Sequence, residues 1–304
     1  MSTHFWLRAE SKKFERRCAI PPNSARALVE AGYRLTIEDD PDRIFPIDDY
    51  AGLPQAPAGS WRNAPADAVI VGLKELPNDG TALRHRHIYF AHAFKEQRGW
   101  RDVLGRFRAG DGSLFDLEFL THPNGKRVAA FGYWAGYVGA VLGVWQWGAK
   151  SERESLKLEA PFSFADRIAL ESMAQRFPIP ESAVVVGARG RSGRGAMDAL
   201  ESLGVKTRVG WDKRDTAEGG PFDALLDFDV FVNCVLLGAE IPPFVTEAQI
   251  ASHPSRKLSV VSDVSCDPTS PWNPIPLYDA ITTVEKPVTA GRGGIDVVAI
   301  DHLP

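Results

Sequence analysis

The chain has 304 residues, with 35 Lys and Arg against 39 Asp and Glu, which gives a formal charge of −4. Nucleic acids and anionic membranes attract proteins with a dense cationic surface, so we expect neither as a partner. The length and the 44% apolar share are typical of a globular protein with more than one domain. Three scattered cysteines without a CxxC pair, and charge in residues 1–17 where a signal peptide is apolar, indicate a cytoplasmic location.

In the first half of the chain, short β-rich runs alternate with helical segments. This alternation is typical of a parallel sheet with helices on its faces. The predicted strands are residues 4–9, 33–39, 66–74, 87–94, 112–120 and 127–132, and the predicted helices are 22–32 and 97–110.

Residues 128–149 contain no charged side chain and are long enough to span a bilayer. Their glycines include the GxxxG spacing of packed membrane helices. We prefer the alternative, a strand that runs into a buried helix, because a single span here would separate two halves that both have an α/β pattern.

The second half repeats the α/β pattern. Residues 181–204 predict a strand, a glycine turn and a helix, after a hydrophilic segment at 151–167. Further strands are predicted at 206–212, 229–237, 257–265 and 295–301. We therefore expect an α/β fold of two Rossmann-like lobes with parallel sheets and an interlobe cleft, residues 1–131 for the substrate and 132–304 for the cofactor.

Gly187, Gly190 and Gly193 follow an apolar strand and open a helix, a variant of the GxGxxG dinucleotide motif. Glycines permit a tight turn here and let a pyrophosphate approach the positive end of the helix. Asp212, at the end of the next strand, favours NAD over NADP, although Lys213 behind it weakens this preference. The turn after the first strand of the first half has no glycine, so that lobe is predicted to lack a dinucleotide site and to be free for substrate.

Lys74 and Glu75 end one predicted strand of the first half, and His92 ends another. At the carboxyl edge of a parallel sheet, the lysine and the histidine could transfer protons, with Glu75 tuning the lysine. The alternatives are a solvated Lys–Glu pair and a histidine with a purely structural role.

Histidines and cations of the same half suggest two further sites. His85, His87 and His92 could form a metal cluster, but no carboxylate spacing supports one, so we predict no metal. A cationic set would suit a small-molecule substrate with several carboxylates. This set is Arg17, Lys95 and Arg127.

Segments along nearly the whole chain resemble, in order, the NAD-dependent, lysine-forming saccharopine dehydrogenases. The most specific are VGLKELP (71–77), HIYFAHAF (87–94), VVGARGRSGRGAM (185–197) and AIDHLP (299–304). The two-lobed plan resembles alanine dehydrogenase more distantly. The resemblance implies an enzyme of lysine biosynthesis that passes hydride from saccharopine to NAD and hydrolyses the imine to lysine and 2-oxoglutarate.

The resemblance also implies roles for individual residues. Lys74 and His92 correspond to an acid–base pair, with Glu75 and Glu118 tuning their basicity. The substrate segments contain Arg17, Lys95, Lys126, Arg127 and Phe131. The cofactor segments contain Gly187, Gly190, Arg191, Ser192, Asp212, Thr216, Val261, Asp301, His302 and Leu303.

Some features depart from the family pattern. Ser192 stands where members of the family can carry cysteine, and Leu236 replaces an aromatic residue. Family chains continue past the DHLP segment and help to build the first lobe, so we expect that lobe to be completed differently here or its substrate pocket to be altered. Two alternatives stay open: an imine reductase or amino-acid dehydrogenase for another amine and 2-oxo acid, and a non-catalytic dinucleotide-binding regulator. A monomer or small homo-oligomer is expected.

Overall fold

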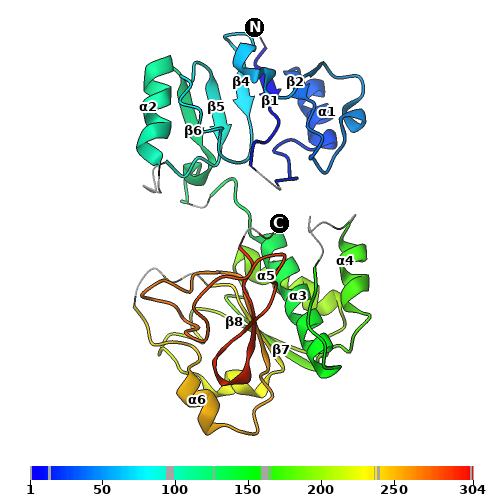
Figure 1. The fold of residues 1–304 in the computed structure, drawn as a ribbon, viewed down its shortest axis with the longest axis vertical. Helices are drawn as coiled ribbons and strands as arrows, with labels where there is room; N and C mark the ends of the chain where they lie inside the picture. The colour runs from blue at the N-terminus through cyan, green and yellow to red at the C-terminus, as the bar shows by residue number, and fades with distance from the viewer. Residues whose placement is uncertain are drawn as a thin grey trace. The chain divides into compact units, whose positions relative to one another are not determined.

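The chain folds into two compact units, each built on one mostly parallel sheet (Figure 1). The structure is a computed structural model that describes residues 2–12, 15–93, 99–125, 127–158, 164, 166–235, 237, 240–301 and 303. Unit 1 is Met1–Ala130 and unit 2 is Phe131–Pro304. The prediction of an α/β, Rossmann-like fold is confirmed.

The sheet of unit 1 is parallel throughout, in the order β3-β2-β1-β4-β5-β6. This is the 3-2-1-4-5-6 order of the dinucleotide-binding fold, in which the strand order reverses beside the first strand. The reversal lies between β1 and β4. The strands are β1 (His4–Leu7), β2 (Arg34–Glu38), β3 (Gln55–Ala56), β4 (Val69–Val71), β5 (Arg86–Tyr89) and β6 (Ser113–Asp116).

Helices α1 (Pro22–Glu30) and α2 (Trp100–Gly110) cover opposite faces of this sheet (Figure 1). Side chains alternate across a strand, so Val71 of β4 joins the core under α1 while Ile70 joins the core under α2. Short 3-10 turns complete the unit: η1 (Ile47–Tyr50), η2 (Ser60–Asn63) and η4 (Leu117–Phe119).

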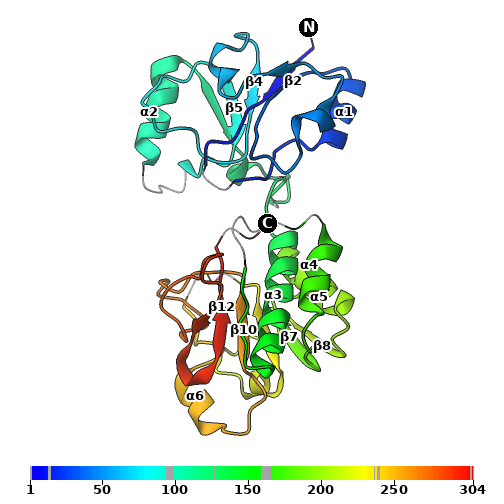
Figure 2. The ribbon, with the colours of Figure 1, turned by 45° about the vertical axis from the view of Figure 1, so that its right-hand side comes forward.

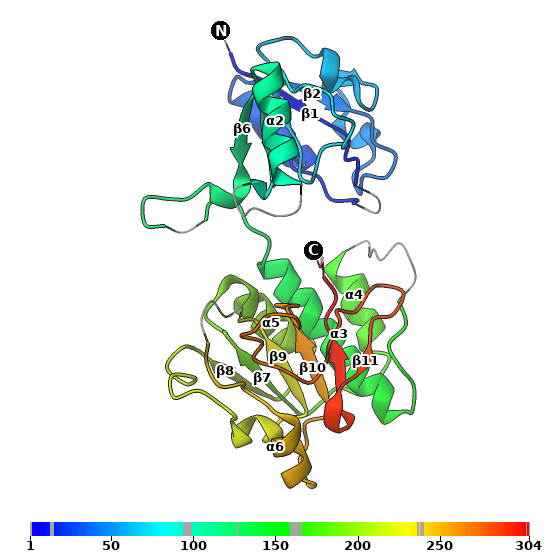
Figure 3. The same ribbon diagram turned by 60° about the vertical axis from the view of Figure 1, so that its left-hand side comes forward.

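The sheet of unit 2 has the order β11-β12-β10-β9-β7-β8, and only β11 is antiparallel. Figure 3 shows β8, β7, β9 and β10 side by side. The strand order reverses between β7 and β9. The strands are β7 (Ser182–Val186), β8 (Thr207–Trp211), β9 (Val230–Asn233), β10 (Val260–Asp263), β11 (Thr289–Ala290) and β12 (Asp296–Val298).

Three helices cover one face of this sheet, and α6 packs with loops on the other (Figure 2). The helices are α3 (Tyr133–Ser151), α4 (Arg167–Ala174), α5 (Arg191–Ser202) and α6 (Glu247–Ser252), with 3-10 turns η5 (Asp223–Asp227) and η6 (Arg292–Gly294).

Helix α3 contains most of the uncharged run of residues 128–149. Its side chains are buried almost all round, which explains the lack of a polar face. Among the described residues, no helix is long and apolar enough to cross a membrane. A Cβ on Gly136 would lie 1.9 Å from the Ser192 carbonyl oxygen, and one on Gly195 would lie 1.9 Å from that of Tyr133. Helices α3 and α5 therefore touch through their backbones.

Several predicted elements differ from the observed ones. The predicted strand at 127–132 is wrong: Arg127 makes a single bridge to Thr121, and the next residues have no neighbouring strand. The strand predicted at 112–120 ends at Asp116, because the Asp116 carboxylate accepts the Glu118 amide at 3.1 Å and starts η4. The short elements β3, β11, α4 and α6 were not predicted.

Candidate active site

A glycine turn joins β7 to α5 in unit 2. Gly187 has φ +87°, and Gly190 is the N-cap of α5, which begins with Arg191 and Ser192. A Cβ on Gly193 would lie 2.1 Å from the Gly187 carbonyl oxygen, so only glycine fits. The first-turn amides of a helix have no acceptor within the helix and attract anions. This turn lies at the strand-order reversal and fits a pyrophosphate.

Asp212 directly follows β8 and is already engaged on both carboxylate oxygens. Its Oδ2 lies 2.8 Å from Arg189 Nε, and its Oδ1 accepts the Arg214 amide at 2.7 Å. Thr216 closes the turn, with its hydroxyl donating to the Asp212 carbonyl at 3.3 Å. Sequence reasoning missed the partnership of Arg189, for which the arginine inside the glycine turn was the available signal. A ribose would meet an aspartate that is paired with an exposed arginine.

The other predicted cofactor residues lie at and beyond the last strands of unit 2. Val261 is fully buried within β10, and Leu303 is buried in the core that contains α3. Asp301 is exposed in the turn after β12. His302 lies outside the described residues. The cofactor roles of these residues stay predictions.

In unit 1, Lys74 and His92 occupy matching places on neighbouring strands. Each lies three residues beyond its strand, after Val71 of β4 and Tyr89 of β5. The two strands are parallel neighbours, and adjacent strands lie about 4.8 Å apart. The backbone contact continues beyond them, because the Phe90 amide donates to the Leu73 carbonyl at 3.1 Å. Both predicted acid–base residues therefore follow the same edge of the sheet.

The surroundings of Lys74 favour its neutral form. Burial lowers the pKa of Lys74, and the charges of Arg17 and Lys12 lower it further, against the opposing effect of Glu15 and Glu75. Arg17 is itself tied to Glu15, with 2.6 Å between Nη2 and Oε2, and Lys12 Nζ lies 3.5 Å from Glu75 Oε1. Lys12 and Glu15 were not predicted as site residues, and their closeness to Lys74 is the reason to include them.

His92 and the predicted tuning residue Glu118 lie close together. His92 Nδ1 is 3.9 Å from Glu118 Oε2, while the other carboxylate oxygen pairs with Arg127. The His92 ring stacks on Phe90, with 6.3 Å between centroids. His92 has φ +51°, a left-handed conformation that is uncommon for residues other than glycine and that often marks functional positions.

The other two histidines of the metal cluster considered above, His85 and His87, make contacts that suit a structural role. His87 is fully buried between Trp61 and Phe107, with 5.3 Å between its ring centroid and each of theirs, and burial lowers its pKa to about 3. His85 Nε2 lies 3.1 Å from the Ala64 carbonyl oxygen. Across the described ranges, no three His, Cys, Asp or Glu side chains form a metal site.

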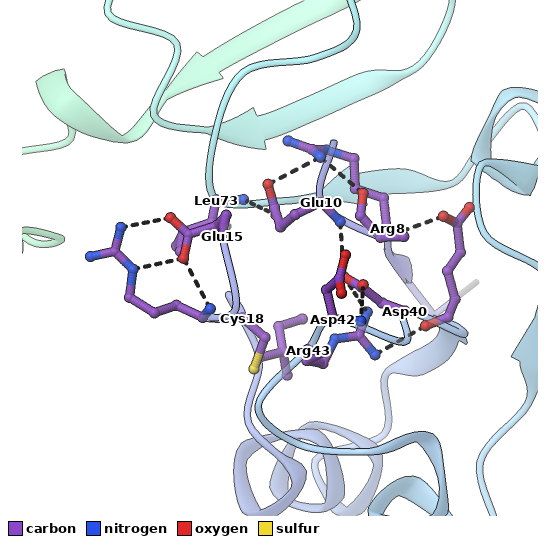
Figure 4. Close-up of polar contacts among 12 residues, drawn as sticks. Arg8, Glu10, Glu15, Cys18, Asp40, Asp42, Arg43 and Leu73 are labelled. Atoms are coloured by element: carbon purple, nitrogen blue, oxygen red, sulfur yellow. Dashed lines mark hydrogen bonds and ion pairs between the residues drawn. The ribbon is translucent and has the colours of Figure 1, made fainter. Parts of the chain in front are cut away.

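At the strand-order reversal of unit 1, the Arg8 side chain lies on the backbone and contacts Glu10 (Figure 4). Arg8 follows β1 and is 1% exposed. A Cβ on Gly72 would lie 2.3 Å from Arg8 Nε, so the guanidinium lies directly on this glycine. A dinucleotide could not approach the backbone here.

Among the predicted substrate residues, Phe131 begins unit 2, and Lys95 and Lys126 lie outside the described residues.

Known proteins match the chain over its full length. Two saccharopine dehydrogenases [NAD(+), L-lysine-forming] are similar to it: that of Schizosaccharomyces pombe is 43% identical and that of Emericella nidulans 44% identical. Each alignment covers 100% of this chain, with 88% and 86% of the respective relative. The profile of the alanine dehydrogenase/PNT N-terminal domain family matches residues 6–138.

Solved structures show the same fold at low sequence identity. An L-alanine dehydrogenase has a TM-score of 0.61 at 18% identity and covers 98% of this chain and 82% of its own. A transhydrogenase from Sinorhizobium meliloti has a TM-score of 0.56 at 15% identity and covers 99% of this chain and 87% of its own.

Proposed function

The chain belongs to the family of NAD(+)-dependent, L-lysine-forming saccharopine dehydrogenases, and we propose that it performs their reaction with Lys74 and His92 as the acid–base pair. The resemblance predicted from the sequence, and with it an NAD-dependent oxidoreductase acting on a C–N bond, is confirmed. The observation that carries the assignment of the pair is its place: two groups suited to proton transfer follow neighbouring strands of one sheet edge.

Unit 2 is the proposed NAD-binding unit. Its glycine turn and the start of α5 would hold the pyrophosphate, and Asp212 with Arg189 would lie at the ribose. NAD, when bound, supplies the acceptor for the hydride. Unit 1 is the proposed substrate unit, because Arg8 fills the corresponding place there.

The reaction requires several proton transfers that the residues of unit 1 can perform. The protonated secondary amine of saccharopine first loses a proton to a base, and loss of hydride from the adjacent carbon then leaves an iminium ion. Water adds to the iminium carbon and gives up a proton. A proton then reaches the nitrogen, and the C–N bond breaks as the new hydroxyl group gives up its proton to a base, which releases lysine and 2-oxoglutarate.

Lys74 suits the role of base because its lowered pKa increases its neutral fraction near neutral pH. His92 beside Glu118 suits the transfers to and from water and nitrogen, since histidine titrates close to neutral pH. We propose that Arg17 and Arg127 contact the substrate carboxylates, together with Lys95, Lys126 and Phe131.

One assay tests the function and the pair. NADH absorbance is followed with saccharopine and NAD, then with lysine and 2-oxoglutarate, and finally with other amines and 2-oxo acids. We expect turnover on saccharopine, and a drop of about 100-fold for each of Lys74→Met and His92→Ala, the usual contribution of a positioned acid or base. Near-normal turnover in the double variant would remove the pair from the mechanism. NADH binding without turnover on any substrate pair would indicate a regulator instead.

We further propose a cytoplasmic enzyme that is a monomer or small homo-oligomer. All three cysteines, Cys18, Cys234 and Cys266, are unpaired, as expected in a reducing compartment. Light scattering of the purified protein measures the oligomeric state, and fractionation of cells measures the location.

A further inference from the structure

Two buried carboxylates of unit 1 bind the backbone around the proposed acid–base pair. Glu10 accepts the Leu73 amide at 2.6 Å on Oε1 and the Lys74 amide at 3.0 Å on Oε2. Asp116 accepts the Ala91 amide on Oδ1 and the Ala93 amide on Oδ2, both at 3.2 Å. Both oxygens of each carboxylate therefore accept backbone amides at, or next to, one acid–base residue.

The Lys74 peptide is held at both ends. Arg8 donates from Nη2 to the Lys74 carbonyl, and its Nη1 lies 3.2 Å from Glu10 Oε2 (Figure 4). The side chains of Arg8 and Glu10 are only 1% and 4% exposed, so water does not compete for these contacts. We call the pair Arg8 and Glu10 the clamp. Asp40 accepts the Glu10 amide at 3.1 Å and so holds the backbone of Glu10 in place.

The segments that carry Lys74 and His92 lie outside the helices and strands. Backbone amides in such segments need other partners, and a carboxylate is a strong one. Asp116 brackets His92 from both sides and so stabilises a left-handed residue that the backbone alone disfavours. Asp116 also accepts the Glu118 amide at 3.1 Å, which links His92 and its carboxylate neighbour to one anchor.

We propose that Glu10, together with Arg8, is the positioning residue for Lys74 and that Asp116 is the positioning residue for His92. This inference rests on the proposed function, because it assigns a task to residues that hold the acid–base pair. Neither carboxylate is a catalytic residue: each acts through the backbone of another residue. A displacement of about 1 Å at a reacting group can slow a reaction about 100-fold, so loss of either anchor has a measurable effect.

The test replaces each carboxylate by its amide, Glu10→Gln and Asp116→Asn. Each change keeps the shape but turns one acceptor into a donor that faces a backbone N–H. We expect turnover of saccharopine to fall about tenfold to 100-fold in both variants, with unchanged NADH affinity, since the glycine turn lies in unit 2. Asp229→Asn is the matched control: Asp229 accepts the Ser182 amide at 2.8 Å at the start of β7, and we expect normal turnover.

The pH profile distinguishes positioning from general damage. A limb of this profile is the rise or fall of kcat/KM with pH that one titrating group causes. We expect Glu10→Gln to shift the limb that Lys74→Met abolishes, and Asp116→Asn to shift the limb that His92→Ala abolishes. The charged groups around the pair, Lys12, Glu15, Arg17 and Glu75 near Lys74 and Glu118 near His92, stay in place in both variants. A fall in turnover that leaves both limbs unchanged, or a change in the same limb by both variants, would overturn the proposal.

A readout without catalysis separates this proposal from the proposed function. Lysines are reductively methylated with ¹³C-formaldehyde, Lys74→Met identifies the Lys74 signal, and the His92 ring signal is assigned in the same way with His92→Ala. We expect Glu10→Gln to change the chemical shift and titration midpoint of Lys74 only, and Asp116→Asn those of His92 only. This result stands even if saccharopine is not turned over, while unchanged signals refute positioning even in an active enzyme.

Glu10→Gln leaves the buried charge of Arg8 without its partner and can prevent folding. The double variant Arg8→Met/Glu10→Leu removes both charges, a change that proteins often tolerate. We expect it to fold and to alter the Lys74 limb and signal. A folded double variant with a wild-type limb and a wild-type Lys74 signal contradicts the role of the clamp.

Discussion

The two units use the same place in a Rossmann-like sheet in opposite ways. At the reversal of strand order, unit 2 has a glycine turn before α5, whereas unit 1 has Arg8 lying on Gly72. The acid at the end of the second strand of each unit differs in the same sense. Glu38 of β2 is fully buried and accepts the Ala9 and Gly59 amides at 2.9 and 2.8 Å, while Asp212 pairs with the exposed Arg189.

This difference suits the two tasks proposed for the units. Where no side chain covers the backbone, its amides and the helix dipole can bind an anion directly. Where a side chain occupies that space, as Arg8 does, it holds the loop beyond β4, and that loop carries Lys74. Substitutions at Gly193 and at Gly72 disturb these two arrangements separately.

Gly193→Ala tests the bare turn of unit 2, and we expect the largest effect here. The new Cβ would lie 2.1 Å from the Gly187 carbonyl oxygen, so the turn has to open and the amides lose their alignment. We expect the Kd for NADH, measured by fluorescence titration, to rise about 100-fold, in line with the effect of overpacking.

The same change at Gly105 serves as the control, because a Cβ there meets no atom within 4 Å in the middle of α2. Gly105→Ala should leave the Kd unchanged and stabilise the protein by about 1 kcal/mol. Wild-type NADH affinity in Gly193→Ala would argue against this turn as the pyrophosphate site.

Gly72→Ala tests the filled reversal of unit 1 and should have a smaller effect. The new Cβ would lie 2.3 Å from Arg8 Nε, and Arg8 is too deeply buried to swing away. We expect Arg8 to shift, the Lys74 loop to loosen, and kcat for saccharopine to fall about tenfold while the Kd for NADH stays constant. An effect on NADH binding instead would show that the two reversals are not independent.

Arg17→Met removes a proposed substrate contact, so we expect the KM for saccharopine to rise. The loss of its charge beside Lys74 should have the smallest effect, a shift in pH dependence. Arg17 lowers the pKa of Lys74, so its removal raises that pKa, and the limb of the pH profile that belongs to Lys74 moves to higher pH. The pKa of Lys74 is lower in the folded than in the unfolded protein, so protonated Lys74 reduces the free energy of unfolding at low pH. This reduction disappears as pH rises from the folded pKa to the unfolded pKa. Arg17→Met makes the reduction smaller.

The pH dependence of kcat/KM for saccharopine measures this shift. Arg26→Met is the control, since Arg26 donates to the Asp49 carbonyl at 2.7 Å and is not among the main groups that shift the pKa of Lys74. A limb that stays in place in Arg17→Met, or that moves to lower pH, would contradict the assignment of that limb to Lys74.

Much of the fold and part of the site could be predicted from local patterns. The strand, glycine turn and helix at residues 181–204 are contiguous, so their sequence contains the whole signal. Lys74 and His92 were predicted because ligands of parallel sheets bind at the carboxyl edge, and their catalytic roles stay predictions. The strand predicted at 127–132 failed because a β-rich run needs a neighbouring strand, and pairing is a property of the fold.

The anchors Glu10 and Asp116 could not be predicted in this way. Glu10 bonds to amides more than 60 residues away, and Asp116 bonds to amides more than 20 residues away. A backbone N–H carries no sequence signature, so its partner is visible only in the folded chain. The pairing of Asp212 with Arg189 joins two side chains more than 20 residues apart, and the arginine inside the glycine turn was its only signal in the sequence.

The glycine contacts between α3 and α5 have a mechanical consequence. Gly136 contacts the Ser192 backbone and Gly195 contacts that of Tyr133, so no side chain of these glycines separates the first turns of the two helices. Protein interiors transmit small displacements because they are close-packed. We therefore expect the start of α3, where the chain enters unit 2, to shift together with the turn proposed to hold the pyrophosphate rather than independently of it.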